Sequence, residues 1–474
     1  MEVSTRKPKI SSTGTGIDRI SSLPDDVLHN VLSSLFIFDV VQLSVLSKRW
    51  RYVWTTMPYL HFDIDQFYSQ RIKQQCDFVI AGRFKDFINW VLISQGETNK
   101  LVQFLLCFDN MFDKVAILRW INHVTLRRNV QQLVLKFCLS ETFELPCCLV
   151  TSQSLQVLKL HLSGDVLKLP NFVGFHQLKF LHLEQVELSD EHLISCLFLN
   201  LETLILKECS VGDMTRLDIA STSLVHITLQ NNISNVECYG NCEIKISCPS
   251  LKVLKYNAPV PKDIVVENLS SIEVVRINLI DSGSIKERGI MLHEVIKNVH
   301  HSTSVLKLCM TSISGLYHVA RRIKLSPFSF YKLKSLKLEV VIYEESMQMM
   351  MLLLKYSPNL EVLKLWSDES VDESVNWQLL DLDESIVCLE SHLKSIHLTG
   401  FKGEENEIEL LKFFLKNALV LEKLMIFWEI NMDKSQEASE EVLNFHRTSS
   451  HVVLTFLDAK PKQRSHNWYN RYSK

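Results

Sequence analysis

The stretch LQVLKL at 155–160 returns as LKFLHL at 178–183, LETLIL at 201–206 and LVHITL at 224–229, each time after 23 residues. Looser copies of the same L-x-x-L-x-L pattern occur on both sides of these at intervals of about 21 to 33 residues, beginning at Leu101, Val130, Leu251, Ile272, Thr303, Leu333, Leu360, Leu393 and Leu421. The last three positions of each copy alternate apolar and polar, as in a half-buried strand. Repetition at this period predicts a solenoid in which every unit adds one short strand and cannot bury its apolar face without its neighbours.

The fold class predicted is α/β, a leucine-rich-repeat solenoid with parallel strands on the concave face and helices on the convex face. Between the strands, residues 83–94, 113–128 and 346–356 have helical periodicity. A leucine-rich helical bundle is disfavoured, because the L-x-L pairs alternate with period 2 at a recurrent register. The residues between the leucines should face solvent and carry recognition; examples are Lys159, His182, Ile205 and Thr228.

Composition is typical of a folded protein, and the N-terminal sequence predicts that its thiols are reduced. Its 474 residues are 46% apolar and 22% charged, with a net charge of −3, so there is no overall basic field for nucleic acid. The 12 cysteines follow an N-terminus without an apolar leader, which indicates the cytosol and/or the nucleus. No apolar run approaches the roughly 18 residues of a membrane span, so we expect neither membrane nor nucleic acid as a partner.

Near the N-terminus, the segment SLPDDVLHNVLSSL at 22–35 predicts an amphipathic helix with Ser22 as its N-cap and Pro24 in the first turn. A second helix is predicted over residues 40–54, capped by Asp39. Helices this short cannot shield so many apolar side chains by themselves. They must pack either on a partner protein or on the rest of the chain, and periodicity alone does not choose between the two.

Residues 17–60 closely resemble the F-box, the helical adaptor-binding motif of cullin-RING ubiquitin ligase receptors. The resemblance depends on Leu23-Pro24, the amphipathic stretch to Leu35, and the block VLSKRW at 45–50. One departure is Phe36-Ile37-Phe38, where the family usually has Pro followed by polar residues. The resemblance implies a set of residues that contact a Skp-type adaptor or support that contact: Leu23, Pro24, Val27, Leu28, Val31, Leu32, Leu46 and Trp50.

The repeats resemble the degenerate plant-type leucine-rich array found after F-boxes, including the phrase CPSLKVL at 248–254. Residues 388–426 resemble the FBD module, and residues 443–456 resemble its final strand region. Within it, residues 404–417 predict a helix with four inward apolar residues, Ile408, Leu411, Phe414 and Leu415. The expected organisation is a leader over 1–16, an F-box over 17–60, a solenoid over 61–387, an FBD module closing its end over 388–457, and a basic tail over 458–474.

The sequence gives little support for a catalytic or metal-binding site. The sequence contains no G-x-x-x-x-G-K-[ST] loop and no G-x-S-x-G elbow, and Lys297 stands where a zincin helix after His293-Glu294 would need its second histidine. Cys238, Cys242, Cys248 and His226 lack the spacing of a zinc knuckle, so ordinary thiols are favoured over a metal site. His293, His300 and His301, like the basic aromatic-bearing tail, are interpreted as solvated or partner-facing surface.

The resemblance therefore implies a substrate-recognition subunit of an SCF-type ubiquitin ligase. The F-box would bind a Skp-type adaptor, and through it a cullin scaffold, while the leucine-rich repeats hold an unidentified target protein. Such a subunit is not an enzyme and needs no cofactor. The alternative from a different class is a stand-alone leucine-rich-repeat scaffold or ligand sensor that is never assembled into a ligase.

Overall fold

The computed structural model describes residues 20, 22–69, 77–96, 100–108, 114–139, 141–169, 174–188, 199–231, 242–280, 283–322, 329–367, 385–430 and 435–458. It divides into two compact units, Met1–Cys107 and Phe108–Lys474, hereafter unit 1 and unit 2. The expected leader over 1–16 and all of the expected tail except Asp458 lie outside the described residues. None of the described helices is both long and apolar enough to cross a lipid bilayer.

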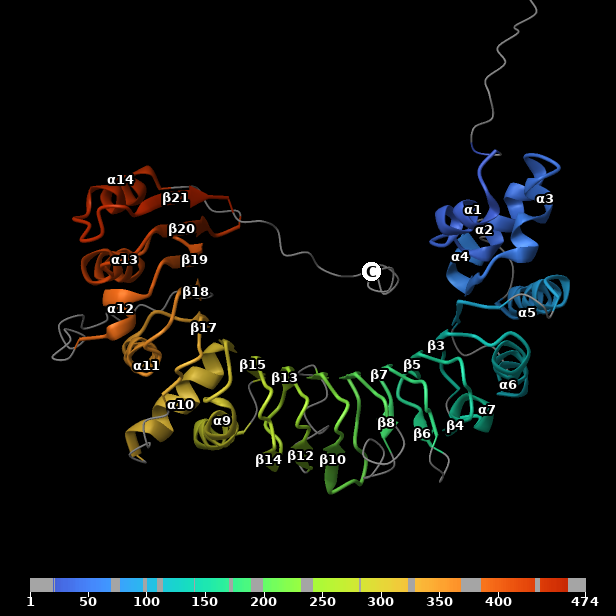
Figure 1. The fold of residues 1–474 in the computed structure, drawn as a ribbon, viewed down its shortest axis with the longest axis horizontal. Helices are drawn as coiled ribbons and strands as arrows, with labels where there is room; N and C mark the ends of the chain where they lie inside the picture. Colours follow the sequence, from blue (N-terminus) through green and yellow to red (C-terminus); the bar gives the residue numbers. More distant parts are fainter. Residues whose placement is uncertain are drawn as a thin grey trace, which may run out of the picture. The chain divides into compact units, whose positions relative to one another are not determined.

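Unit 1 is a set of short helices followed by two parallel strands (Figure 1). Its elements are α1 (Asp25–Leu32), α2 (Ile37–Gln42), η1 (Leu43–Val45), α3 (Trp50–Val53), η2 (Trp54–Thr56), β1 (Tyr59–Asp63), α4 (Ile64–Ser69), α5 (Asp77–Ser94) and β2 (Gln103–Cys107). Its core includes Leu28, Ile37, Val53, Phe62 and Ile88, each at most 4% exposed.

Two sequence expectations for unit 1 are wrong in detail. The N-cap of α1 is Pro24 rather than Ser22, because Pro24 holds the extended conformation from which the helix starts, and Asp25 and Asp26 then occupy the favourable first turn. The second helix is not continuous over 40–54 but breaks into α2, η1 and α3. It begins at Ile37, so Asp39 lies inside its first turn instead of capping it. Burial of Ile37 at 1% exposed explains the earlier start.

Unit 2 confirms the predicted solenoid. Its long parallel sheet runs in the order β3-β5-β7-β9-β11-β13-β15-β16-β17-β18-β19-β20-β21. The bounds are β3 (Gln132–Lys136), β5 (Val157–His161), β7 (Phe180–Glu184), β9 (Thr203–Lys207), β11 (His226–Gln230), β13 (Val253–Ala258), β15 (Val274–Leu279), β16 (Val305–Leu308), β17 (Ser335–Val340), β18 (Val362–Ser367), β19 (Ser395–Phe401), β20 (Lys423–Trp428) and β21 (Val453–Leu457). All the predicted repeats carry a strand that starts at the third residue of the motif, and the motif leucines are buried.

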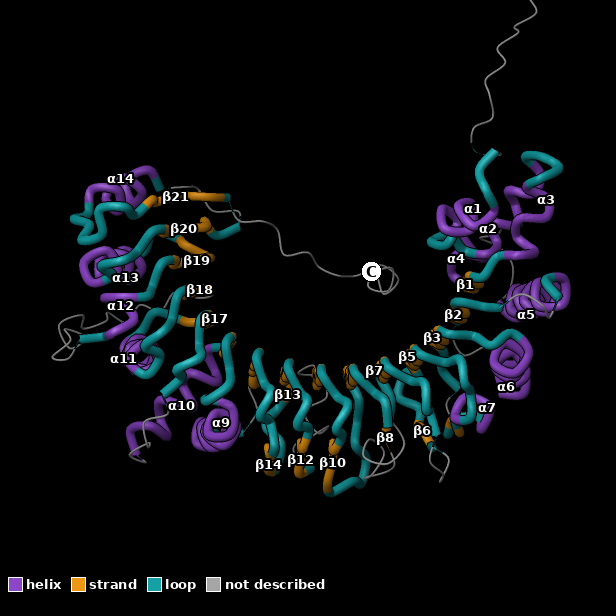
Figure 2. Tube along the Cα trace, in the orientation of Figure 1, coloured by secondary structure: helices purple, strands orange, loops and turns teal. Residues whose placement is uncertain are grey.

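The convex side of unit 2 carries helices at both ends and short strands between them (Figure 2). The helices are α6 (Lys114–Asn122), the π-helix η3 (His123–Arg127), α7 (Cys147–Val150), α9 (Ile285–Val299), α10 (Met310–Arg322), α11 (Glu344–Lys355), α12 (Val387–Ser391), α13 (Glu405–Asn417) and α14 (Gln436–Asn444). The short strands are β4 (Phe143–Glu144), β6 (Val166–Lys168), β8 (Glu187–Leu188), β10 (Arg216–Ala220), β12 (Glu243–Ser247) and β14 (Asp263–Glu267). In this middle part the convex face carries short strands where the sequence predicted helices.

The predicted helices over 83–94, 346–356 and 404–417 are confirmed as α5, α11 and α13. In α13 the apolar residues pack inward as expected, with Leu411 and Phe414 at most 1% exposed. Because β19, β20 and β21 continue the same sheet, with α12 before β19 and α13 between β19 and β20, the C-terminal module is a further strand–helix extension of the solenoid, and β21 is its last described strand.

Candidate protein-binding surface

The two halves of the N-terminal motif are joined by one side chain. The guanidinium of Arg49 lies 2.7 Å from Oδ1 of Asp25 and also donates to the carbonyl oxygen of Leu23. The Leu23-Pro24 turn that opens α1 therefore lies beside the turn that opens α3. An ion pair this exposed contributes little free energy by itself, but it fixes which residues are neighbours at the surface.

Burial divides the eight residues expected to make or support adaptor contact. Leu28, Leu32 and Trp50 are 0%, 4% and 8% exposed and belong to the core of unit 1. Leu23 is half-buried and Pro24 is exposed. The exposed apolar members are Val27 at 42%, Val31 at 60% and Leu46 at 64%.

The exposed apolar residues of α1 follow helical spacing. Val27 and Val31 are four residues apart, so they share one face of α1, and the exposed Leu35 follows at the same spacing just beyond the end of the helix. Val45, in η1, is 85% exposed and directly precedes Leu46. We call Pro24, Val27, Val31, Leu35, Val45 and Leu46 the apolar face. An apolar patch rimmed by polar residues is typical of a protein interaction site.

The expected site set did not include Leu35 and Val45. A signal for both was present in the sequence: Leu35 continues the stripe of Val27 and Val31, and Val45 stands next to Leu46. Periodicity alone does not tell which of the apolar residues of α1 pack against the rest of unit 1 and which face solvent. Leu28 and Leu32 lie one position beyond Val27 and Val31, and they are the ones that turn inward.

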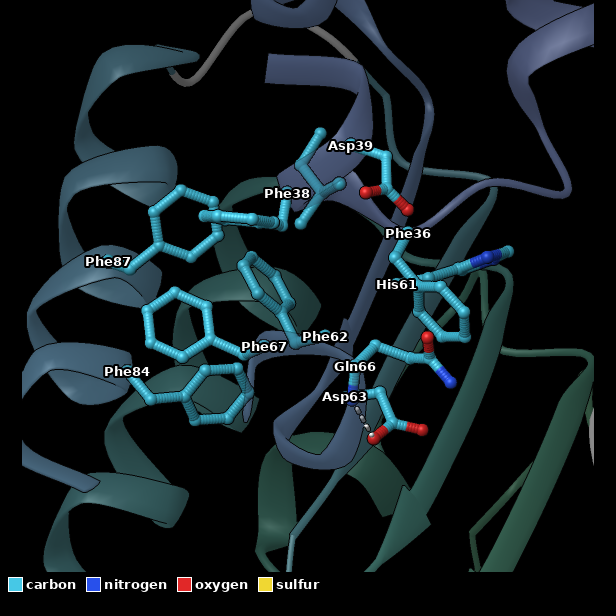
Figure 3. Close-up of a pocket in the computed structure, with 11 residues that line it drawn as sticks. Phe36, Phe38, Asp39, His61, Phe62, Asp63, Gln66, Phe67, Phe84 and Phe87 are labelled. Atoms are coloured by element: carbon cyan, nitrogen blue, oxygen red, sulfur yellow. Dashed lines mark hydrogen bonds between the residues drawn. The ribbon is translucent and has the colours of Figure 1, made fainter. Parts of the chain in front are cut away.

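The departure at Phe36-Ile37-Phe38 is explained by packing inside unit 1. These residues form the start of α2 rather than a loop, and the ring of Phe38 lies 5.1 Å from that of Phe67 and 5.6 Å from that of Phe87. Figure 3 shows the Phe38 side chain directed into this aromatic cluster. Apolar residues at this position therefore attach α2 to α4 and α5 of the same unit.

Further contacts hold the helices rigidly. Nε2 of His29 lies 3.1 Å from the hydroxyl of Thr56. The Gln95 amide donates to the carbonyl oxygen of Trp54 at 2.7 Å. The indole of Trp54 stacks on that of Trp90, with ring centroids 4.7 Å apart. The apolar face is thus presented by a preorganised scaffold, which reduces the entropy lost on binding.

On the solenoid, the outward positions differ from expectation at two of the four examples. Ile205 and Thr228 are half-buried and accessible, but Lys159 and His182 are only 8% and 7% exposed. Nζ of Lys159 lies 5.2 Å from the centre of the Phe180 ring. His182 Nε2 lies 3.4 Å from a carboxylate oxygen of Glu184. The neighbour of Lys159 lies on the adjacent strand β7, whereas Glu184 lies on the same strand as His182.

The surroundings of Lys159, His182 and Glu184 shift the pKa values of all three side chains. Burial lowers the pKa of Lys159 to about 8, and burial lowers the pKa of His182 to about 4, with Glu184 acting in the opposite direction. For Glu184 burial acts to raise the pKa, but the hydrogen bond and charge of Lys207 outweigh it and leave the pKa below its usual range. His182 is therefore neutral at neutral pH, and Glu184 and Lys207 form the ion pair.

The candidate metal ligands are not brought together. Cys242 and Cys248 are buried free thiols at the two ends of β12, and His226 is exposed at the start of β11; Cys238 lies outside the described residues. Burial raises the pKa of Cys248 to about 11, which keeps it a thiol. Among the residues that the structure describes, no group of three or more His, Cys, Asp or Glu side chains is placed to hold a metal.

The histidines of α9 are placed differently from one another. His293 is half-buried, whereas His300 is the C-cap residue, with Nδ1 3.0 Å from the carbonyl oxygen of Lys297. His301 is exposed.

Comparison with known proteins identifies both ends of the chain. Residues 20–62 match the F-box domain, and residues 383–426 match FBD. F-box/FBD/LRR-repeat protein At3g52680 of Arabidopsis thaliana is 31% identical over 428 residues, which cover 86% of this chain and 85% of the relative.

Two further relatives from Arabidopsis thaliana match at similar length. F-box/FBD/LRR-repeat protein At3g26920 is 28% identical over 93% of this chain and 96% of its own length. Putative F-box/FBD/LRR-repeat protein At1g66300 is 26% identical over 94% of this chain and 95% of its own. With the helical N-terminal unit, the parallel solenoid and both terminal modules in the same order, this chain belongs to the plant F-box/FBD/LRR-repeat protein family.

Proposed function

We propose that this protein is the substrate-recognition subunit of an SCF-type ubiquitin ligase. In this proposal the apolar face of unit 1 binds a Skp-type adaptor, which links the chain to a cullin scaffold, and the solenoid of unit 2 binds a target protein. The observation that carries the proposal is the exposed apolar stripe of α1 and η1, which lies within the segment that matches the F-box domain.

The division of the eight residues supports distinct roles. Val27, Val31 and Leu46 are exposed and would contact the adaptor directly, because burying them against a partner removes apolar surface from water. Leu28, Leu32 and Trp50 would support that contact from the core. Arg49 would hold the two parts of the face in register through Asp25.

The protein itself would be non-catalytic. A receptor accelerates ubiquitin transfer by raising the effective concentration of target lysines near a charged conjugating enzyme. This role requires two binding surfaces and no acid, base or nucleophile.

The test is adaptor co-purification by a double variant, Val31→Glu with Leu46→Glu. Each change places a charge in the proposed interface without touching the core, so we expect adaptor affinity to fall by about a hundredfold or more. The matched control is Ile93→Glu with Leu126→Glu, because these residues are 79% and 63% exposed and lie outside the apolar face. Adaptor binding retained by the Val31/Leu46 variant would contradict the proposed surface.

The stand-alone scaffold keeps one observation in its favour, which is that α2 packs on the aromatic cluster of its own unit. Under that alternative the helices would serve to close one end of the chain. A folded wild-type protein that binds no Skp-type adaptor would favour it and would overturn the ligase proposal.

A further inference from the structure

Six neighbouring strands of unit 2 carry cationic or ionisable nitrogen side chains at one outward register position. The strand pairings place Lys255 opposite Arg276, Arg276 opposite Lys307, and so on across β13, β15, β16, β17, β18 and β19. The column consists of five cations, Lys255, Arg276, Lys307, Lys337 and Lys364, and ends at the imidazole of His397, which is neutral at neutral pH; we call these six residues the cation ladder. These strands line the concave side of unit 2 in Figure 1.

The ladder is accessible and poorly neutralised. Arg276 is exposed and the other five members are half-buried. Among the described residues, Lys307 is the ladder member that forms an ion pair, with Glu339 at 2.5 Å. Glu339 is also the one carboxylate at an outward position within these six strands.

In contrast to the ladder, two lysines just before these strands form ion pairs with glutamates. Lys252 lies 3.3 Å from Glu273, and Lys334 lies 2.6 Å from Glu361, each pair joining neighbouring strands. At those positions the sheet alternates positive and negative charge. The ladder repeats one sign instead.

A column of like charges costs folding free energy. Adjacent strands lie about 4.8 Å apart, and like charges directly opposite each other destabilise a sheet. Burial, together with Lys364, Arg276 and Lys307, lowers the pKa of Lys337. Burial, then Lys364 and Lys337, lowers the pKa of His397. The folded protein therefore retains a positive field that an anionic partner would relieve.

The neighbours of the ladder indicate what kind of anion fits. On one side runs a row of half-buried side chains in which four of the six are valines, Val253, Val274, Val305 and Val362, while Ser335 and Ser395 occupy this position on β17 and β19; we call it the valine row. On the other side stand Glu339 and the half-buried indole of Trp366. A row of aliphatic side chains suits apolar residues of a protein, whereas a nucleic-acid surface interleaves its cations with aromatic stacking platforms.

We propose that the cation ladder binds an acidic segment of a target protein, with carboxylates on the ladder and apolar side chains on the valine row. This rests on the proposed function, since the target is what a receptor solenoid would hold. Six strands at about 4.8 Å span roughly 24 Å, which an extended chain covers with about 8 residues.

The test uses the full chain and a fluorescent peptide of about 12 residues in which Glu alternates with Val and Ala. We expect the peptide to bind wild-type protein more weakly as salt rises. Binding should fall about tenfold in Lys337→Gln with Lys364→Gln, because two charge-assisted contacts are lost. Neutralising like charges leaves the thermal midpoint equal or higher, so the loss cannot be ascribed to unfolding. The control, Lys286→Gln with Lys416→Gln, removes two exposed lysines from α9 and α13 and should bind normally.

Three results would overturn the assignment. These are wild-type protein that ignores the peptide, a ladder variant that binds it as well as wild type, and equal binding of the peptide with Glu replaced by Gln. A single-stranded oligonucleotide that binds more tightly than the peptide, and is lost in the ladder variant, would reassign the ladder to nucleic acid. Adaptor co-purification by the ladder variant separates this test from that of the proposed function, because unit 1 is unchanged.

Discussion

Lys159 shows how a position that alternation assigns to solvent can lie inside the protein. Its side chain is 8% exposed and its ammonium group lies near the Phe180 ring. A contact with an aromatic face compensates only part of the cost of removing a charge from water. The lowered pKa of Lys159 has this same origin, since burial disfavours the charged form.

Replacing this ammonium group with an apolar side chain of similar length should stabilise the protein. For Lys159→Met we expect the free energy of unfolding at pH 7 to rise by about 1 kcal/mol, measured by chemical denaturation. The advantage should shrink as pH rises from about 8 to 10.5. In that window the unfolded lysine binds a proton that the folded one has lost, so the wild type gains stability.

Lys286→Met provides the comparison, because Lys286 is exposed on α9. That change should leave stability within a few tenths of a kcal/mol. A Lys159→Met protein that is less stable than wild type at pH 7 would mean that the ammonium group makes a net favourable interaction.

Between elements, α9 and α10 approach each other closely at two glycines. A Cβ placed on Gly289 would lie 2.1 Å from the carbonyl oxygen of Gly315, and one placed on Gly315 would lie 2.8 Å from the backbone nitrogen of Gly289. Two helix backbones therefore touch without side chains between them. Glycine is needed here for space, since a methyl group would separate the helices.

This contact predicts a large effect for a small substitution. Gly289→Ala should destabilise unit 2 by about 2 kcal/mol or more, because the clash is with backbone that cannot move aside. Gly82→Ala is the matched control in α5, where a Cβ meets no heavy atom within 4 Å. Relief of the glycine entropy cost should raise stability there by up to about 1 kcal/mol. Thermal unfolding followed by circular dichroism measures both, and equal effects would show that helix propensity alone decides.

Over the whole molecule, buried and half-buried histidines predict sensitivity to acid. Burial is the main cause that lowers the pKa of five of them, His61, His161, His182, His293 and His397. As pH falls below about 6.5, these histidines become protonated in the unfolded chain while they are still largely neutral in the folded protein. The free energy of unfolding should therefore fall between pH 6.5 and about 4. Glu407, whose pKa burial raises, acts in the opposite direction.

The measurement is chemical denaturation at pH 7, 6 and 5. His182→Gln should reduce the loss of stability, since the pKa of His182 is lowered to about 4. The same change at exposed His226 should leave the pH dependence intact. Stability that is constant from pH 7 to pH 5 would contradict the prediction.

Local pattern was enough to predict the architecture of the chain. The recurring L-x-x-L-x-L motif predicts every strand of the long sheet from β2 to β20, because alternation and repeat length are properties of neighbouring residues, but it does not predict the short strands of the convex side. The helices α5, α11 and α13 follow from their own periodicity. The start of α2 at Ile37 does not, since it depends on packing such as that of Phe38 against Phe67 in α4 and Phe87 in α5.

For the binding surfaces, the sequence by itself determined the residues available, and the tertiary structure decided which of them are exposed. Val31 and Leu32 are equally apolar, yet one faces solvent and the other the core, because α1 packs on one side only. Each member of the cation ladder is the fifth residue of its motif, in six consecutive motifs from LKVLKY at 251 to LKSIHL at 393. Only the pairing of parallel strands in register brings those distant residues into a single column of charge.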